Sequence, residues 1–217
     1  MLLDALAALV PVPCAGCGEE GRLLCAACRG ALAPRPVAEP VPGVGVVHAG
    51  LAYDGVARAA ILALKERGAS GLAAPLAVPF AAAVTTALAA SPPVDAIVAV
   101  PSTWAARRRR GFEPVRLLAA RSGIRLSRVF APARPHGAQK ALGIAERGRN
   151  LAGAFALEQS VAGRRVLLVD DVLTTGATLA AAAAVLRAGG AEVAAAAVLA
   201  ATARRDGRVR GMLSKTP

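Results

Sequence analysis

The chain has 217 residues, which is enough for one α/β domain with a small appendage. Its net charge of +12 is unevenly spread, because residues 101–150 hold twelve of the 26 lysine and arginine side chains and only two of the 14 carboxylates. Such a basic segment attracts polyanions such as diphosphate, nucleotides or nucleic acid. The six aromatic residues are too few for a platform that stacks many bases in succession, which argues against that class of single-strand binder.

The first ten residues are apolar but lack the features of a secretion signal. No basic residue precedes the apolar run, and Asp4 interrupts it. Leu2, Leu6 and Leu9 recur at helical spacing, which predicts a short amphipathic helix. We expect no membrane-spanning segment anywhere in the chain, and therefore a cytoplasmic protein.

All four cysteines lie in one short segment, as two C-x-x-C pairs separated by seven residues: Cys14, Cys17, Cys25 and Cys28. Two such pairs bring four thiolates within reach of one tetrahedral centre, and the expected occupant in a reducing compartment is a structural Zn²⁺ ion. Two disulfides, an iron–sulfur centre and a redox-active C-x-x-C pair are the alternatives. A segment this small has little core of its own, so metal binding would supply its folding energy.

The middle of the chain alternates apolar segments with turn residues. A stretch rich in proline and valine, residues 34–48, predicts a linker. Helices are predicted over 56–66, 72–90 and 114–121, and strands over 94–100 and 126–130. This order favours an α/β fold built on a parallel sheet.

Polar and basic residues follow the strand predicted over 94–100. Ser102 and Thr103 offer hydroxyl groups, and Arg110 ends a run of four arginines. Charge-assisted hydrogen bonds from such groups are suited to an anion such as diphosphate. The alternative is that the arginines lie on a solvated helix or form a nonspecific polyanion patch.

Residues 166–179 carry the most specific pattern. Val166–Val169 predict a buried strand, and Asp170 and Asp171 follow at its carboxyl end. A turn rich in hydroxyl groups comes next and leads into a helix; its residues are Thr174, Thr175, Gly176, Ala177 and Thr178. Backbone N–H groups at a helix N-terminus favour a phosphate, and paired carboxylates suit vicinal hydroxyls, so the segment predicts a site for a ribose 5-phosphate. The alternative is an ordinary strand-to-helix turn with a solvated Asp pair and a threonine N-cap.

This segment resembles the signature of type I phosphoribosyltransferases, which bind phosphoribosyl pyrophosphate (PRPP). The resemblance implies that Asp170 and Asp171 are catalytic residues that bind the ribose hydroxyls, with Mg²⁺ as cofactor, and that Thr174–Thr178 bind the 5-phosphate. It also implies a diphosphate site made of Ser102, Thr103, Arg110, Lys140 and Arg147. The last two lie in residues 132–150, the counterpart of a flap that closes over the diphosphate. The implied fold is a parallel α/β sheet with helices on both faces, plus the small zinc module.

Further motifs within residues 1–200 resemble the ComF family of competence-associated phosphoribosyltransferase-like proteins. Besides the cysteine pairs they include Tyr53, Lys65, Arg110-Gly-Phe112, Gln139, Arg147 and Asn150. The resemblance implies a PRPP-binding transferase with a role in DNA uptake, an acceptor that the motifs do not identify, and single-stranded DNA or competence-machinery proteins as partners. A non-catalytic protein that binds nucleotides or single-stranded DNA with the same fold is the alternative. Glu113-Pro114 departs from the Asn-Gln that relatives commonly carry there.

Four parts make up the expected organisation. Residues 1–33 form the N-terminal helix and zinc module, residues 34–48 the linker, residues 49–203 the phosphoribosyltransferase-like domain, and residues 204–217 a disordered basic tail. PRPP or a related ribose phosphate is the expected ligand, and no membrane association is expected.

Overall fold

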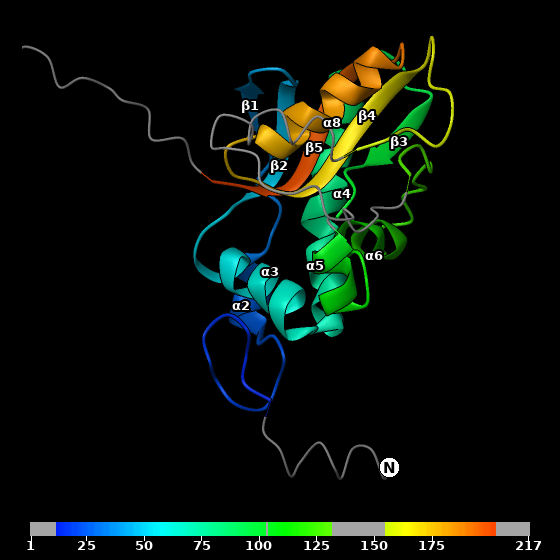
Figure 1. Cartoon of the computed structure of the whole chain (residues 1–217). Helices are drawn as coiled ribbons and strands as arrows, with labels where there is room; N and C mark the ends of the chain where they lie inside the picture. Colours follow the sequence, from blue (N-terminus) through cyan, green and yellow to red (C-terminus); the bar gives the residue numbers. More distant parts are fainter. Residues whose placement is uncertain (1–11, 103, 132–154, 203–217) are drawn as a thin grey trace, which may run out of the picture.

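A computed structural model describes residues 12–102, 104–131 and 155–202 of the chain. Its centre is a five-stranded sheet in the order β1-β2-β5-β4-β3, in which β1 is antiparallel to β2 and the other neighbours are parallel (Figure 1). The strands are β1 Val37–Val41, β2 Gly45–Ala52, β3 Ala96–Ala99, β4 Arg165–Leu173 and β5 Glu192–Ala201. The predicted N-terminal helix, the flap-like segment and the basic tail lie outside the described residues.

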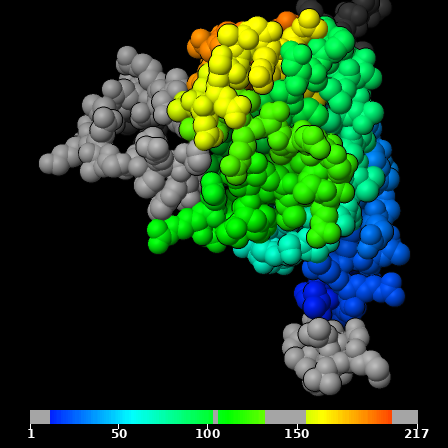
Figure 2. Space-filling model, turned by 90° about the vertical axis from the view of Figure 1, so that its right-hand side faces the viewer, coloured from blue at the N-terminus to red at the C-terminus, as the bar shows by residue number. Residues whose placement is uncertain are grey.

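Helices cover both faces of this sheet, as expected. The helices are α2 Ala26–Ala31, α3 Gly55–Arg67, the 3₁₀ turn η1 Ser70–Leu72, α4 Ala73–Ala89, α5 Trp104–Arg110, α6 Pro114–Arg121 and α8 Ala177–Ala188. One apolar cluster packs α3, α4 and α6 against one face, and a second packs α8 against the other. Both faces of the central strands are therefore buried, which explains the continuous apolar runs in their sequence. Figure 2 shows the cysteine-bearing segment, in blue, as a small lobe below the main body.

The predicted helices over 56–66, 72–90 and 114–121 are confirmed as α3, α4 and α6. The predicted strand over 94–100 is confirmed as the shorter β3. The prediction of a strand over 126–130 is wrong. The segment makes only one parallel bridge to β3, through Ser127, and one antiparallel bridge, from Phe130 to Leu157. Two single bridges to different partners cannot build a continuous strand.

The linker predicted over residues 34–48 is also wrong, because this stretch contains β1 and the start of β2. Three valines of this stretch are buried in the core: Val41, Val44 and Val47. Pro40 does not prevent the pairing, since β1 is an edge strand and proline is tolerated where no second neighbour needs its N–H. These three valines are thus core residues of a hairpin, whereas Val37 and Val46 of the same stretch are exposed.

One helix among the described residues, Ser70–Ala89, is long and apolar enough to cross a membrane, a feature that the sequence expectation overlooked. Half of its most apolar window is buried within the protein. Leu76, Phe80 and Val84 on this helix lie in the apolar cluster against the sheet. The helix therefore acts as a core helix of this domain.

Candidate functional site

Two adjacent carboxylates interrupt the buried strand β4. Val166–Val169 are fully buried, whereas Asp170 and Asp171 are half-buried in the carboxyl-terminal part of the strand. The strand runs on to Leu173, so the acid pair lies within it, where the sequence had placed the pair just after it. Asp170 pairs with Val198 of β5, and Val172, just after Asp171, pairs with Ala200, so the backbone that carries both carboxylates is fixed by the sheet.

A lysine from a distant part of the chain pairs with this acid pair. Lys65, near the end of α3, donates a hydrogen bond of 2.8 Å from its Nζ to Oδ1 of Asp171. The two side chains are only 18% and 15% exposed, so solvent screens this ion pair little. The backbone N–H of Asp171 donates to Oδ1 of Asp170 at 2.8 Å. We call Asp170, Asp171 and Lys65 the acid-pair site.

When both carboxyl groups are ionised, the acid-pair site holds two negative charges and only one partner cation, Lys65. Burial, and then the neighbouring Asp171 carboxylate, raise the pKa of Asp170 to about 8. The N–H of Asp171 and the Lys65 ammonium act in the opposite direction but do not offset this rise. Hydroxyl donors or a divalent cation would supply the missing interaction, and two carboxylates with free oxygens are ligands that Mg²⁺ prefers.

The turn after β4 leads into α8 through a glycine that no other residue could replace without strain. Gly176 has a φ of 80°, and a Cβ on it would lie 2.5 Å from Cγ1 of Val41. Thr174, Thr175 and Thr178 are exposed around it, and the N–H of Ala177 donates to Oγ1 of Thr175 at 3.3 Å. The turn thus surrounds the N-terminus of α8, where unpaired N–H groups and the helix dipole favour an anion.

The segment after β3 opens into a pocket of about 290 Å³. Ser102, Phe112 and Phe130 are among the residues that line it. Ser102, one of the expected diphosphate ligands, therefore lies at the carboxyl end of the strand next to β4. Thr103, Lys140 and Arg147, which were expected to join it, lie outside the described residues.

Arg110, at the end of α5, is directed toward α3. Its Nη2 lies 3.8 Å from Oε1 of Glu66, and its side chain is 14% exposed. The Nε of Arg110 is buried and has no hydrogen-bond partner among the described residues. A buried guanidinium with an unused donor is suited to bind an anion. Arg109 also approaches Glu66, at 3.5 Å, but is 64% exposed.

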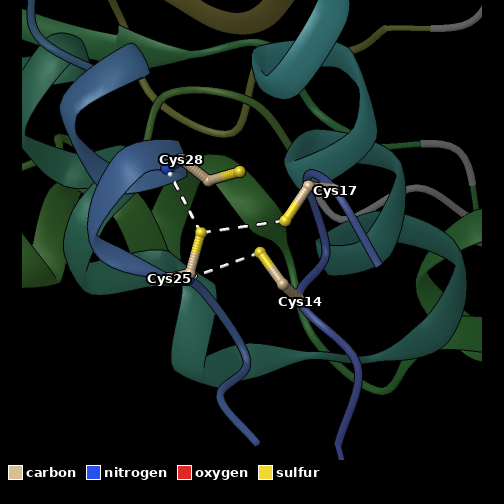
Figure 3. A group of neighbouring side chains, drawn as sticks. All are labelled: Cys14, Cys17, Cys25 and Cys28. Carbon is tan, nitrogen blue, oxygen red and sulfur yellow. Dashed lines mark hydrogen bonds between the residues drawn. The ribbon is translucent and has the colours of Figure 1, made fainter. Parts of the chain in front are cut away.

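The four cysteines come together as the sequence predicts (Figure 3). Their sulfur atoms all lie within 4.8 Å of one another, and Sγ of Cys17 is 3.7 Å from Sγ of Cys25. Four sulfurs at 2.3 Å from a tetrahedral zinc ion would be about 3.8 Å apart. All four thiols are free, so the pair of disulfides is not formed. The geometry can hold a zinc ion.

The cysteine cluster is part of the main core. Cys14 and Cys28 are buried in the same apolar cluster as α3 and α4. A Cβ on Gly16 would collide with both Sγ of Cys28 and Cγ1 of Val56, so the first cysteine loop lies directly against α3. The expectation that this segment has little core of its own is confirmed only in part. The segment has few buried residues, but these pack against α3 in the main core.

The thiols differ in their environment. The N–H of Cys25 donates to Sγ of Cys14 at 3.3 Å, and such backbone donors lower the pKa of Cys14 to about 6. Burial, together with the neighbouring thiols, raises the pKa of Cys28 to about 12. A cation at the centre of the cluster would favour the thiolate form of all four.

Part of the chain is similar to a known domain family. Residues 108–214 match the family model of the phosphoribosyl transferase domain. No curated protein matches the chain. The matched region includes α6, β4, the threonine turn, α8 and β5, and therefore includes the acid pair. It leaves out the cysteine cluster, the β1–β2 hairpin and α3.

Lys65 and Glu66 are the residues that the sequence interpretation did not place in the site. Lys65 was named only as one of the residues that resemble the ComF family, and no role was predicted for it. The available signal was the charged end of α3, which follows the apolar run Ile61 to Leu64. Their partners, Asp171 and Arg110, are too far along the chain for spacing to connect them.

Proposed function

We propose that this protein binds PRPP at the acid-pair site and transfers its phosphoribosyl group to an acceptor. The observation that carries the proposal is the acid-pair site itself, because two half-buried carboxylates with one lysine directly precede a threonine turn at a helix N-terminus. The matched phosphoribosyltransferase domain supports the same assignment.

Each part of PRPP has a chemically suited partner in this arrangement. The 5-phosphate would bind the turn Thr174–Thr178 through hydroxyl and backbone N–H groups. The ribose hydroxyls would donate to Asp170 and Asp171, which would offset the burial that raises the pKa of Asp170. When bound, Mg²⁺ would neutralise part of the charge of the diphosphate.

The diphosphate would lie toward the end of β3. Ser102 is at that end, and the unused Nε of Arg110 is a charged donor on the neighbouring helix α5. Glu66 holds Arg110 in the absence of ligand, and a diphosphate would compete with Glu66 for the guanidinium. Positioning and charge neutralisation of the leaving group would thus come from α3 and α5 together.

The resemblance to the ComF family suggests that this activity serves DNA uptake in the cytoplasm, with a zinc ion in the cysteine cluster. Single-stranded DNA is a weaker candidate ligand. Arg107 and Arg109 of α5 are exposed, but both lie within 4.0 Å of a carboxylate, from Glu113 and Glu66 respectively. A polyanion would have to displace these ion pairs, so we place PRPP first.

Replacing Asp170 and Asp171 together with asparagine tests the proposal. The double variant should lose detectable PRPP binding in isothermal titration calorimetry with Mg²⁺. Neither the ribose hydroxyls nor Mg²⁺ would then have a carboxylate to bind. Asp95→Asn is the matched control, since Asp95 accepts a hydrogen bond from the N–H of Arg165 at the opposite end of β4 and an amide oxygen can do the same. PRPP affinity at the wild-type level in the double variant, with an unchanged circular dichroism spectrum, would reject the proposal.

A further inference from the structure

The four cysteines differ in how far solvent reaches them. Cys17 is exposed and Cys25 is half-buried, whereas Cys14 and Cys28 are only 4% and 5% exposed. Next to Cys17, Gly18 has a φ of 82°, and a Cβ on it would meet no atom within 4 Å. Among the described residues, no side chain therefore covers Cys17 from this side. A small oxidant can reach its sulfur directly.

The sulfur beside Cys17 belongs to the second cysteine pair. Sγ of Cys25 lies 3.7 Å from Sγ of Cys17 (Figure 3). A disulfide has a sulfur–sulfur distance of about 2.05 Å, so the two atoms would have to approach by roughly 1.7 Å. Gly18 and Gly21 follow Cys17 in its loop, and both have positive φ values and open space around them. Such a loop can move its exposed end toward Cys25 at little cost.

Cys14 and Cys28 are poorly placed to replace Cys25 in this pair. Both are packed in the apolar cluster with α3 and α4, and a Cβ on Gly16 would lie 2.6 Å from Sγ of Cys28. Sγ of Cys14 also accepts a hydrogen bond of 3.3 Å from the N–H of Cys25. A bond from either sulfur to Cys17 would disrupt these contacts. Cys25, at the N-cap of α2, would lose only the 3.5 Å hydrogen bond from the N–H of Cys28.

We propose that Cys17 is an oxidation site at which hydrogen peroxide produces a disulfide with Cys25. The disulfide in turn lowers the metal content of the cysteine cluster. Neither residue belongs to the acid-pair site, and nothing in this chemistry depends on the proposed function.

The reaction has two steps. The sulfur of Cys17 takes one oxygen from the peroxide as the O–O bond breaks, which gives a sulfenic acid, and the other oxygen leaves as water. The sulfur of Cys25 then bonds to the sulfur of Cys17, the S–O bond breaks, and the second oxygen also leaves as water. Together the two thiols give up two electrons and two protons, which the peroxide accepts.

The disulfide would remove two of the four expected zinc ligands. Cys14 and Cys28 alone leave a tetrahedral zinc ion half-coordinated, so the cluster should no longer retain it. The same two residues keep their packing against α3, so the main core stays in place. A dithiol can then restore the free thiols by disulfide exchange, and the cluster can bind metal again.

Trypsin separates the two cysteine pairs, which allows a direct test. Cleavage after Arg22 and Arg29 yields peptide 1–22, with the first pair, and peptide 23–29, with the second. A disulfide across the cluster links these peptides, whereas a disulfide within either C-x-x-C pair does not. The full-length protein as purified is treated with one equivalent of hydrogen peroxide. The remaining thiols are then alkylated, and the digest is analysed by mass spectrometry.

The linked peptide should be the main product, with Cys14 and Cys28 alkylated. Loss of the Cys17 thiol should be roughly tenfold faster than loss of either buried thiol, because the oxidant reaches it first. Zinc release, measured with a chromogenic chelator, should follow the same time course as the linked peptide. Dithiothreitol should reverse both changes.

Two variants distinguish a defined pair from general oxidation. Cys17→Ser should form no linked peptide. Cys25→Ser leaves the sulfenic acid at Cys17 without its partner, so dimedone should label Cys17 and not Cys14. Far-UV circular dichroism checks that each variant is folded, and if one is not, the mapping of the wild type still decides.

Three results would overturn the assignment. Disulfides could form within the C-x-x-C pairs, the linked peptide could join cysteines other than Cys17 and Cys25, or it could form without loss of zinc. PRPP is absent from all of these experiments, so their failure leaves the proposed function standing.

Discussion

The acid-pair site and the cysteine cluster both hold groups that become anionic on losing a proton, but the protein surrounds these groups differently. In the acid-pair site a lysine from α3 already pairs with one carboxylate. In the cysteine cluster the interactions that set the pKa of Cys14 and Cys28 come from backbone N–H groups, burial and the other cysteines. We therefore expect the cluster to need a metal ion for its stability, whereas the acid pair already has a cationic partner in the protein.

Helix α3 connects the two regions. Val56, in its first turn, lies against the first cysteine loop, and Lys65, near its end, reaches Asp171. Because α3 contacts both regions, we expect a change in position at one end to reach the other. Loss of metal from the cysteine cluster should therefore affect the acid-pair site through the placement of Lys65.

The largest effect should follow from Cys28→Ser. Because Cys28 is an expected metal ligand and is buried against α3, we expect the variant to bind no zinc. Its free energy of unfolding should fall by about 3 kcal/mol or more, roughly 6–12 °C in Tm. Zinc content by elemental analysis and thermal unfolding by circular dichroism measure both losses. Cys17→Ser is the control for packing, since Cys17 is exposed and its replacement should cost the metal but little apolar contact.

Wild-type protein treated with a chelator should resemble Cys28→Ser in Tm and should bind PRPP more weakly. A chelated protein with the Tm and PRPP affinity of untreated protein would show that the cluster neither needs a metal nor influences the acid-pair site through α3.

A smaller effect is expected from Lys65→Met. The Lys65 ammonium is one of the groups that keep the pKa of Asp170 from rising further, so its removal should favour the protonated acid pair. PRPP affinity should fall at least tenfold, about 1.4 kcal/mol, and its pH dependence should shift to higher pH. Titration calorimetry across the pH range measures both. Lys65→Arg keeps the charge and should recover most of the affinity, and equal Kd values for all three proteins would show that Lys65 plays no part.

Features made of residues close together in the sequence could be predicted, whereas contacts between residues far apart in the sequence could not. The cysteine quartet and the Asp-Asp-to-threonine turn are short and local, so residue types and spacing were enough to predict them. The Lys65–Asp171 pair joins residues 106 positions apart, and no spacing rule connects such partners before the register of the sheet is known. The β1–β2 hairpin was missed for a related reason. The prolines and valines of the edge strand β1 look like a linker until its partner β2, which in turn pairs with β5, is present.

The smallest effect separates stability from function at the acid-pair site. Asp170 has its pKa raised from an ordinary value of 3.8 to about 8, so between these values the folded protein binds a proton that the unfolded chain releases. The stability that this group contributes is therefore fully present below about pH 4 and is lost progressively as pH rises toward 8.

The variant Asp170→Asn mimics the protonated state at every pH, and its amide oxygen can still accept a hydrogen bond from the N–H of Asp171. The variant should match the wild type in Tm near pH 4 and exceed it by about 2–4 °C at pH 8, a gain of about 1 kcal/mol, while binding PRPP far more weakly. Scanning calorimetry of the ligand-free proteins at several pH values measures the difference. If the variant is less stable than the wild type at pH 8, the acid pair is not under electrostatic strain, and the case for a ligand that relieves it is lost.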